Sequence, residues 1–140
     1  MILHRTGTVI ATTSLDPIFT LLAPNAGGVT IFLENLDPTN YILYSVLVST
    51  DNINYVPLVS DSQSYGVNGN YNTSAILTPA NGSSANQAMI SVRTAAPYLQ
   101  LVASASANST VESGSYAAQL SYGITTLTPS TSQNFTNGTL

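Results

Sequence analysis

The stretch that decides the fold of this chain is Gly28–Leu58, which reads GVTIFLENLDPTNYILYSVLVSTDNINYVPL. Apolar and polar residues alternate along Val29–Leu36 and along Tyr41–Ser49, with the period of two at which side chains leave opposite faces of a strand. On the first strand, the expected faces are Val29, Ile31 and Leu33 on one side and Thr30, Phe32 and Glu34 on the other. Asp37–Asn40 lies between the strands and has the proline and asparagine of a tight turn. We therefore expect the central hairpins of a β-sandwich here.

Short strand signals recur on both sides of this stretch. Turn residues and β-branched residues dominate, and helical spacing never lasts beyond two turns. The other expected strands are Thr6–Thr13, Ile18–Leu22, Tyr55–Val59, Ala88–Arg93, Tyr98–Ala105 and Val111–Ile124. Pro57 places one of them at a sheet edge, because proline cannot donate to a ladder of backbone hydrogen bonds. The pattern predicts one all-β domain, a β-sandwich or jelly roll.

We expect this domain to have three parts. Residues 1–25 are predicted to form an N-terminal arm and edge strand, which Pro17 kinks. Residues 26–124 are the predicted sandwich core, and residues 125–140 a tail that is flexible or ordered by a partner. Within the core, Ser60–Gly82 is predicted to be a long loop with one short strand, and loops of this length are often functional.

Charge content separates this chain from most soluble domains. Only 6% of its residues are charged, whereas about a quarter of the residues of an ordinary soluble domain are. The chain has no lysine and two arginines, and its formal net charge is -4. Binding of nucleic acid or of an anionic membrane requires clustered basic residues, so we expect neither partner. A neutral polar surface also lacks the repulsion that keeps copies apart, which favours self-association or docking on another protein.

The residue types of common catalytic and metal sites are scarce. The chain has no cysteine, and its single histidine, His4, lies too near the terminus to be held as the base of a catalytic triad. Asp16 and Asp37 precede prolines and are explained by turns. Asp51, with the asparagines that follow it and Asp61, offers oxygen ligands for calcium, but the spacing favours a hairpin turn instead. We expect no enzyme, no cofactor and no metal.

Three further segments carry a resemblance: Leu43–Leu58 (LYSVLVSTDNINYVPL), Tyr98–Ser106 (YLQLVASAS), and the alternating strand that closes through Tyr122. Together they resemble small β-sandwich structural proteins of tailed bacteriophages, of the head decoration or cement type. The resemblance implies a non-enzymatic virion protein that is assembled in the host cytoplasm and stabilises the shell. It also implies the major capsid protein or other virion subunits as partners, and a homo-oligomer, with a trimer favoured.

An alternative function comes from the tyrosines of the long loop. Tyr65 and Tyr71 can stack on sugar rings, and a similar strand–turn layout occurs in discoidin-like carbohydrate-binding sandwiches, although this chain lacks their tryptophan and cysteine. A carbohydrate-binding or receptor-binding module of a tail, fibre or cell surface is therefore the second hypothesis. For either function, the expected interaction residues are Ile2, Ile18, Phe19, Tyr65, Tyr71 and Phe135.

Overall fold

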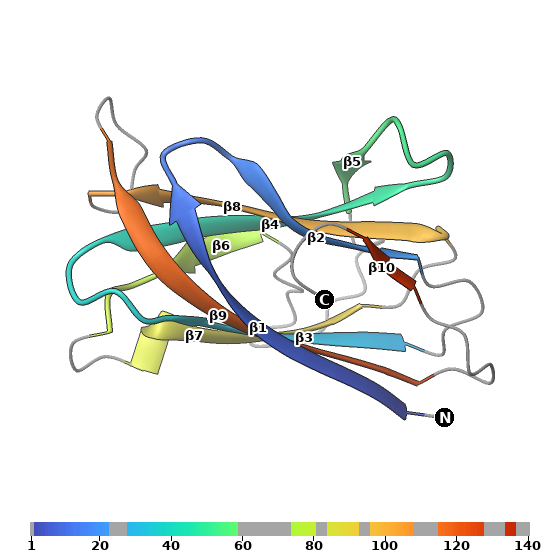
Figure 1. Cartoon of the computed structure of the whole chain (residues 1–140), viewed down its shortest axis with the longest axis horizontal. Helices are drawn as coiled ribbons and strands as arrows, with labels where there is room; N and C mark the ends of the chain where they lie inside the picture. The colour runs from blue at the N-terminus through green and yellow to red at the C-terminus, as the bar shows by residue number, and fades with distance from the viewer. Residues whose placement is uncertain are drawn as a thin grey trace.

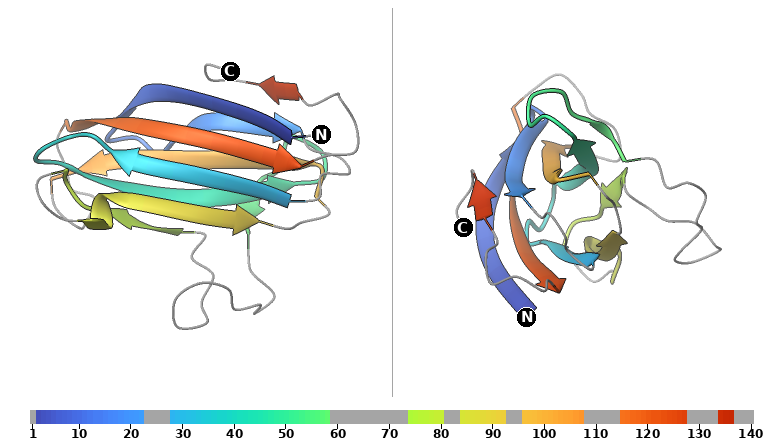
Figure 2. Two further views of the ribbon diagram at one scale, coloured as in Figure 1. Left: turned by 90° about the horizontal axis from the view of Figure 1, so that it is seen from below. Right: turned by 90° about the vertical axis from the view of Figure 1, so that its right-hand side faces the viewer.

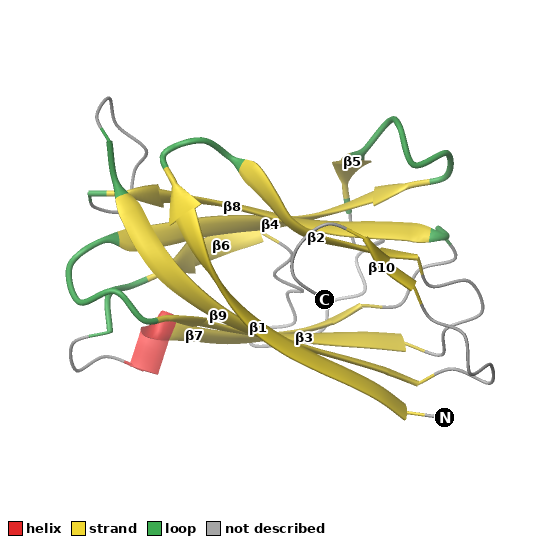
Figure 3. Cartoon of the chain, viewed as in Figure 1, coloured by secondary structure: helices red, strands yellow, loops and turns green. Residues whose placement is uncertain are grey.

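A computed structural model describes residues 2–22, 28–58, 74–80, 84–92, 96–107, 115–127 and 134–136 of the chain. Strands account for nearly all of its regular structure, which confirms the all-β prediction (Figure 3). The elements are β1 (Ile2–Thr12), β2 (Asp16–Leu22), β3 (Gly28–Asn35), β4 (Tyr41–Ser49), β5 (Val56–Pro57), β6 (Ser74–Leu77), the 3₁₀ turn η2 (Ser84–Asn86), β7 (Gln87–Val92), β8 (Tyr98–Ser106), β9 (Ala117–Leu127) and β10 (Asn134–Thr136).

The strands form two antiparallel sheets that pack face to face as a β-sandwich. Sheet A has the order β1-β9-β3-β7, and sheet B has the order β10-β2-β8-β4-β5, with β6 also paired to β4. Figure 1 shows the two layers, with β4 and β8 in the upper one and β3 and β7 in the lower one. The turns after β1 and after β3 carry the chain from one sheet to the other. The expected hairpin across Asp37–Asn40 is therefore wrong, because β3 and β4 pack in opposite sheets instead of pairing. Apart from β4 and its partners β5 and β6, neighbours within a sheet are distant in sequence.

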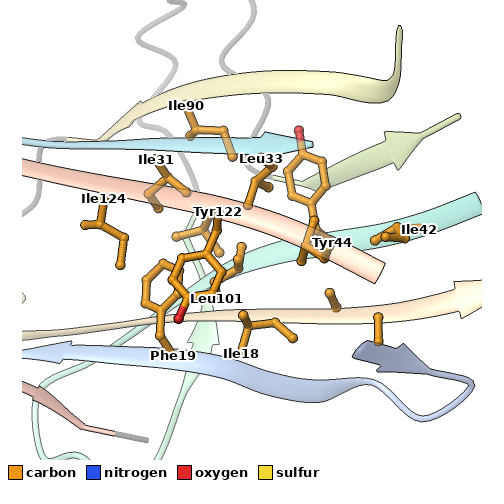
Figure 4. Packing of buried hydrophobic residues seen from close by; sticks show 14 of the residues in the cluster. Ile18, Phe19, Ile31, Leu33, Ile42, Tyr44, Ile90, Leu101, Tyr122 and Ile124 are labelled. Atoms are coloured by element: carbon orange, nitrogen blue, oxygen red, sulfur yellow. The ribbon is translucent and has the colours of Figure 1, made fainter. Parts of the chain in front are cut away.

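The core lies between the sheets and follows the alternation of the sequence. Val29, Ile31 and Leu33 of β3 are buried, as predicted, while the residues between them are partly exposed. Figure 4 shows Phe19 of sheet B beside Tyr122 of sheet A, with ring centroids 5.5 Å apart. Such a tilted aromatic pair adds a directional contact to the burial of apolar area.

Gly7 makes room for that tyrosine. It lies directly opposite Tyr122 in the register of β1 and β9. A Cβ atom at position 7 would stand 2.5 Å from Oη of Tyr122. The tyrosine is 1% exposed, so its ring occupies the space that a side chain at position 7 would fill. Glycine is therefore required by a close approach at this position.

The N-terminal part of the chain differs from the predicted arm. β1 pairs with β9 along its whole length, and β2 lies inside sheet B between β8 and β10. Ile18 and Phe19 are 4% and 0% exposed, so they belong to the core. The cause is a β-bulge, because the register between β2 and β8 shifts between Pro17 and Phe19. A bulge turns two successive side chains toward the same face, which alternation alone does not predict.

The C-terminal part also differs from the predicted boundary at residue 124. β9 continues through Leu127 and pairs there with β1 on one side and β3 on the other. Asn134–Thr136 then adds a short strand beside β2. Strand pairing therefore extends into the segment that was expected to be a tail. The predicted edge position of Pro57 is confirmed, since β5 lies at one end of sheet B.

Candidate interaction surfaces

The expected interaction residues fall into three groups in the structure. Ile18 and Phe19 are core residues and offer no surface to a partner. Ile2 and Phe135 lie on strands, where their backbones pair with Leu127 and Leu21.

Tyr65 and Tyr71 lie outside the described residues. The carbohydrate hypothesis that depends on these two tyrosines therefore stays a prediction. Its test is a glycan array with Tyr65→Ala and Tyr71→Ala as controls.

Titratable groups are sparse and dispersed over the fold. His4 is exposed on β1, and its Nδ1 atom lies 2.7 Å from Oγ1 of Thr125 on the neighbouring strand. Across the segments that the structure describes, no three acidic, histidine or cysteine residues come close enough to hold a metal ion, and no helix is long and apolar enough to cross a membrane. A surface that binds a partner would therefore consist mainly of neutral residues.

The outward side of sheet A is the broadest such surface, and we call it the neutral face. The left view of Figure 2 looks onto sheet A, with β1 in dark blue at one edge and β7 in yellow at the other. The strand registers place on this face His4, Thr6, Thr8, Ile10 and Thr12 of β1, Gln119, Ser121, Gly123 and Thr125 of β9, Thr30, Phe32 and Glu34 of β3, and Gln87, Met89 and Ser91 of β7. Within that set, only His4 and Glu34 can carry a charge.

Apolar side chains stand among the hydroxyls of the neutral face. Met89 is 70% exposed and Ile10 is 55% exposed, and the two lie on opposite edge strands. Phe32 is half-buried and lies directly opposite Met89 in the ladder of β3 and β7. Methionine and aromatic residues with few charges among them are the composition of protein–protein interface cores. The face therefore suits an uncharged protein partner.

The β4–β5 turn is a second exposed feature and confirms the predicted hairpin turn. Oδ1 of Asp51 accepts hydrogen bonds from the backbone N–H groups of Ile53 at 2.9 Å and Asn54 at 2.8 Å, and from the Ser49 hydroxyl at 2.9 Å. Its Oδ2 accepts one from the Asn54 side chain at 2.8 Å. The backbone N–H groups of Asn54 and Ile53, followed by these side chains, hold the pKa of Asp51 well below its usual range.

This turn presents one large apolar side chain at its tip. Ile53 is 78% exposed, and the residue before it, Asn52, has a positive φ of 62°. The Tyr55 hydroxyl donates to Oδ1 of Asn52 at 2.6 Å, which adds to the bonds around Asp51. Desolvation, with smaller contributions from Tyr98 and Asp51, raises the pKa of Tyr55. The turn is a preorganised projection with an isoleucine at its apex.

Two buried groups contrast with these surface features. Burial raises the pKa of Tyr44, whose ring lies in the core. Asn35, fully buried at the end of β3, holds the β3–β4 turn and the segment after β6 together. Both are structural, since neither is accessible to a partner.

Sequence reasoning missed some of the exposed apolar residues. Alternation already placed Phe32 outward, and the same rule applied to β7 would have placed Met89 beside it. The outward position of Ile10 follows from alternation along the expected strand Thr6–Thr13, once Ala11 is known to be buried. The exposure of Ile53 follows from its position inside the turn. For the strand residues, the sequence feature that predicts exposure is therefore alternation with the buried residues of the same strand.

Comparison with known proteins identifies no relative: no protein-family model, curated protein or solved structure matches the chain. The function is therefore argued from the geometry and chemistry of the chain itself.

Proposed function

We propose that this chain is a non-enzymatic structural protein of a tailed-bacteriophage virion, of the capsid decoration type, which docks on the major capsid protein or a neighbouring virion subunit. The observation that carries the proposal is the neutral face of sheet A, where Ile10, Phe32 and Met89 stand among Ser and Thr hydroxyls. The β-sandwich fold and the low charge of the chain are consistent with it.

The chemistry of the neutral face supports protein docking more than ligand binding. Hydroxyl groups make hydrogen bonds with neutral partners, and the exposed apolar side chains contribute burial of apolar area. On a shell, the same weak contact repeats at many equivalent positions. A linked or oligomeric decoration protein then binds with an avidity that exceeds the affinity of one contact.

Purified virions of the phage that encodes the chain give the direct test. Mass spectrometry should detect the chain at a fixed ratio to the major capsid protein, and cryo-electron microscopy should show sheet A facing the shell. Absence of the chain from the particle would sink the proposal.

A pair of lysine substitutions tests the docking face itself. Met89→Lys puts a charge on the neutral face, whereas Ile53→Lys puts one on the β4–β5 turn at similar exposure. We expect Met89→Lys to weaken binding to undecorated particles by about tenfold or more, because a charge is desolvated in the contact, and Ile53→Lys to leave it unchanged. Equal effects of the two substitutions would contradict docking through the neutral face.

A further inference from the structure

The edges of the two sheets differ in how they are protected. An edge strand exposes backbone N–H and C=O groups that can pair with another chain, and natural sheets shorten, bulge or charge such strands, or place proline in them. In sheet B the outer strands are short, because β5 has two residues, one of them Pro57, and β10 has three. In sheet A, β7 has six residues and β1 has eleven. Among the described strands, β1 therefore offers the longest outer edge.

Along most of its length, β1 also lacks the bulges, charges and prolines that protect edge strands. Its register with β9 runs without a bulge from Ile2 to Thr12. The segment Thr6–Thr12 reads TGTVIAT and contains no proline and no charged residue. The ionisable residues of the strand, His4 and Arg5, lie near its N-terminal end. Apart from its glycine, the segment has the high β-propensity and low charge of sequences that pair edge to edge.

We propose that β1 pairs antiparallel with β1 of a second copy of this chain, across a two-fold axis close to Thr8. This pairing joins two copies of sheet A into one continuous sheet. It places Thr8 opposite Thr8 of the partner subunit and Thr6 opposite Ile10 of the partner subunit. Outward residues then meet outward residues, so the exposed Ile10 gains a β-branched cross-strand neighbour.

The positions of the charged residues on β1 favour a second copy of the chain as the partner that pairs with this strand. In this register, His4 lies opposite Thr12 of the partner subunit, and Arg5 lies opposite Ala11 of the partner subunit. No like charges meet across the ladder, although the two strands are identical. The pairing is isologous and therefore closes as a dimer without leaving a free β1 edge.

The dimer goes beyond the proposed function and stands without it. It joins two neutral faces into one surface, which doubles the area available for docking. It also differs from the trimer that the resemblance to decoration proteins implies, because a two-fold contact builds even numbers of copies.

Cysteine cross-linking tests the pairing directly, because the chain has no cysteine of its own. Thr8→Cys should form a disulfide-linked dimer under mild oxidation, since directly opposite residues of an antiparallel pair have close Cβ atoms. Gln87→Cys is the matched control: Thr8, Ser121, Glu34 and Gln87 lie in one row across sheet A, and Gln87 is exposed on the other edge strand. Equal cross-linking of Thr8→Cys and Gln87→Cys would overturn the proposal. So would the absence of cross-linking both in Thr8→Cys and in the double variant Thr6→Cys/Ile10→Cys, whose two cysteines face each other across the dimer in this register.

Molar mass in solution supplies the second test and is independent of any virion. Light scattering should give the wild-type protein twice the mass of one chain. Thr8→Lys brings two lysines together at the axis and should weaken dimerisation by about tenfold, whereas Gln87→Lys should leave the mass unchanged. A monomeric or trimeric wild-type protein would overturn the proposal. A molar mass other than that of a dimer would leave the proposed virion function untouched. Conversely, absence of the chain from virions would leave the proposed dimer untouched.

Discussion

Asn35 and Thr126 are both fully buried on neighbouring strands of sheet A, at opposite ends of the sandwich. The side-chain N–H₂ group of Asn35 donates to the carbonyl oxygens of Asn40 at 2.9 Å and Thr78 at 3.0 Å, and its Oδ1 accepts from the backbone N–H of Asp37 at 2.9 Å. The hydroxyl of Thr126 has no hydrogen-bond partner within the described part of the chain. One buried polar group is therefore well satisfied and the other is not.

The two ends also differ in the span of sequence that their side-chain networks connect, although the Oγ1 atom of Thr78 at the Asn35 end has no hydrogen-bond partner among the described residues either. At the Asn35 end, on the left of Figure 1, hydrogen bonds join the β3–β4 turn, the segment after β6 and η2, because Asn86 also donates to the backbone oxygen of Asn35 at 3.2 Å. At the other end, on the right, Asp51 bonds only residues 49–54. The Asn35 network joins segments that are far apart in the sequence, whereas the Asp51 network shapes one exposed turn.

The largest expected effect comes from breaking the Asn35 network. Asn35→Ala leaves the part-buried carbonyl groups of Asn40 and Thr78 without their donor and removes a fully buried side chain. It should lower the free energy of unfolding by about 3 kcal/mol. Urea denaturation measures the change. Asn54→Ala removes an exposed amide at the other end and should cost less than about 0.5 kcal/mol. Similar losses from the two substitutions would show that the ends do not differ as described.

A second substitution tests how far the network extends. Asn86 is 8% exposed and reaches Asn35 through one hydrogen bond. Asn86→Ala should therefore lower the free energy of unfolding by about 1.5 kcal/mol. In a double-mutant cycle with Asn35→Ala, the two losses should add to within about 0.5 kcal/mol, because Asn86 bonds the backbone oxygen of residue 35, which Asn35→Ala retains. A larger coupling would show that Asn86 also depends on the Asn35 side chain.

At the opposite end we expect a gain. Thr126→Val replaces an unpaired buried hydroxyl with a methyl group of similar size, so the cost of desolvating the hydroxyl disappears. The free energy of unfolding should rise by about 1 kcal/mol, which thermal denaturation detects. Thr6→Val, at an exposed position on the outward side of β1, is the control and should change little. A loss of stability in Thr126→Val would mean that its hydroxyl has a partner.

The smallest effect is a pH dependence at the β4–β5 turn. The pKa of Asp51 is lower in the folded protein than in the unfolded chain, so the carboxylate contributes stability above its unfolded pKa of about 3.9. That contribution is lost as the pH falls through the unfolded pKa toward the folded one. The stability difference between wild type and Asp51→Asn should therefore be largest near neutral pH and shrink below about pH 4. A difference that is constant over this range would contradict the assignment.

Local signals in the sequence predicted the local parts of this structure. The period-two pattern placed Val29, Ile31 and Leu33 in the core. Turn chemistry placed turns at Asp37, whose Oδ2 accepts from the backbone N–H of Asn40, and at Asp51. Only the turn at Asp51 closes a hairpin, because β3 and β4 lie in different sheets. Each of these depends on residues within a few positions of one another, and such patterns are readable without tertiary contacts.

Contacts between residues that are far apart in the sequence could not be predicted in this way. The partners of the Asn35 side chain include Thr78, 43 residues away in the chain, and no spacing rule connects such positions. Ile18 and Phe19 looked like surface residues of an arm, because the bulge that turns both inward is set by pairing with β8. The exposed candidates Met89 and Ile10 depend on which strands end sheet A, which is a property of topology.

The bulge in β2 has a consequence for how the chain tolerates changes of length. Ile18 has no partner on β8, whereas Pro17 pairs with Val102 and Phe19 pairs with Leu101. Removing one residue at this position would restore a regular ladder without shifting Phe19–Leu22 against β8. Elsewhere in a paired strand, a one-residue deletion would turn every following side chain to the wrong face. Position 18 is thus a point at which a one-residue deletion keeps the register of a sheet, at the cost of the buried Ile18 side chain. Changes of length that keep strand register are ordinarily confined to loops.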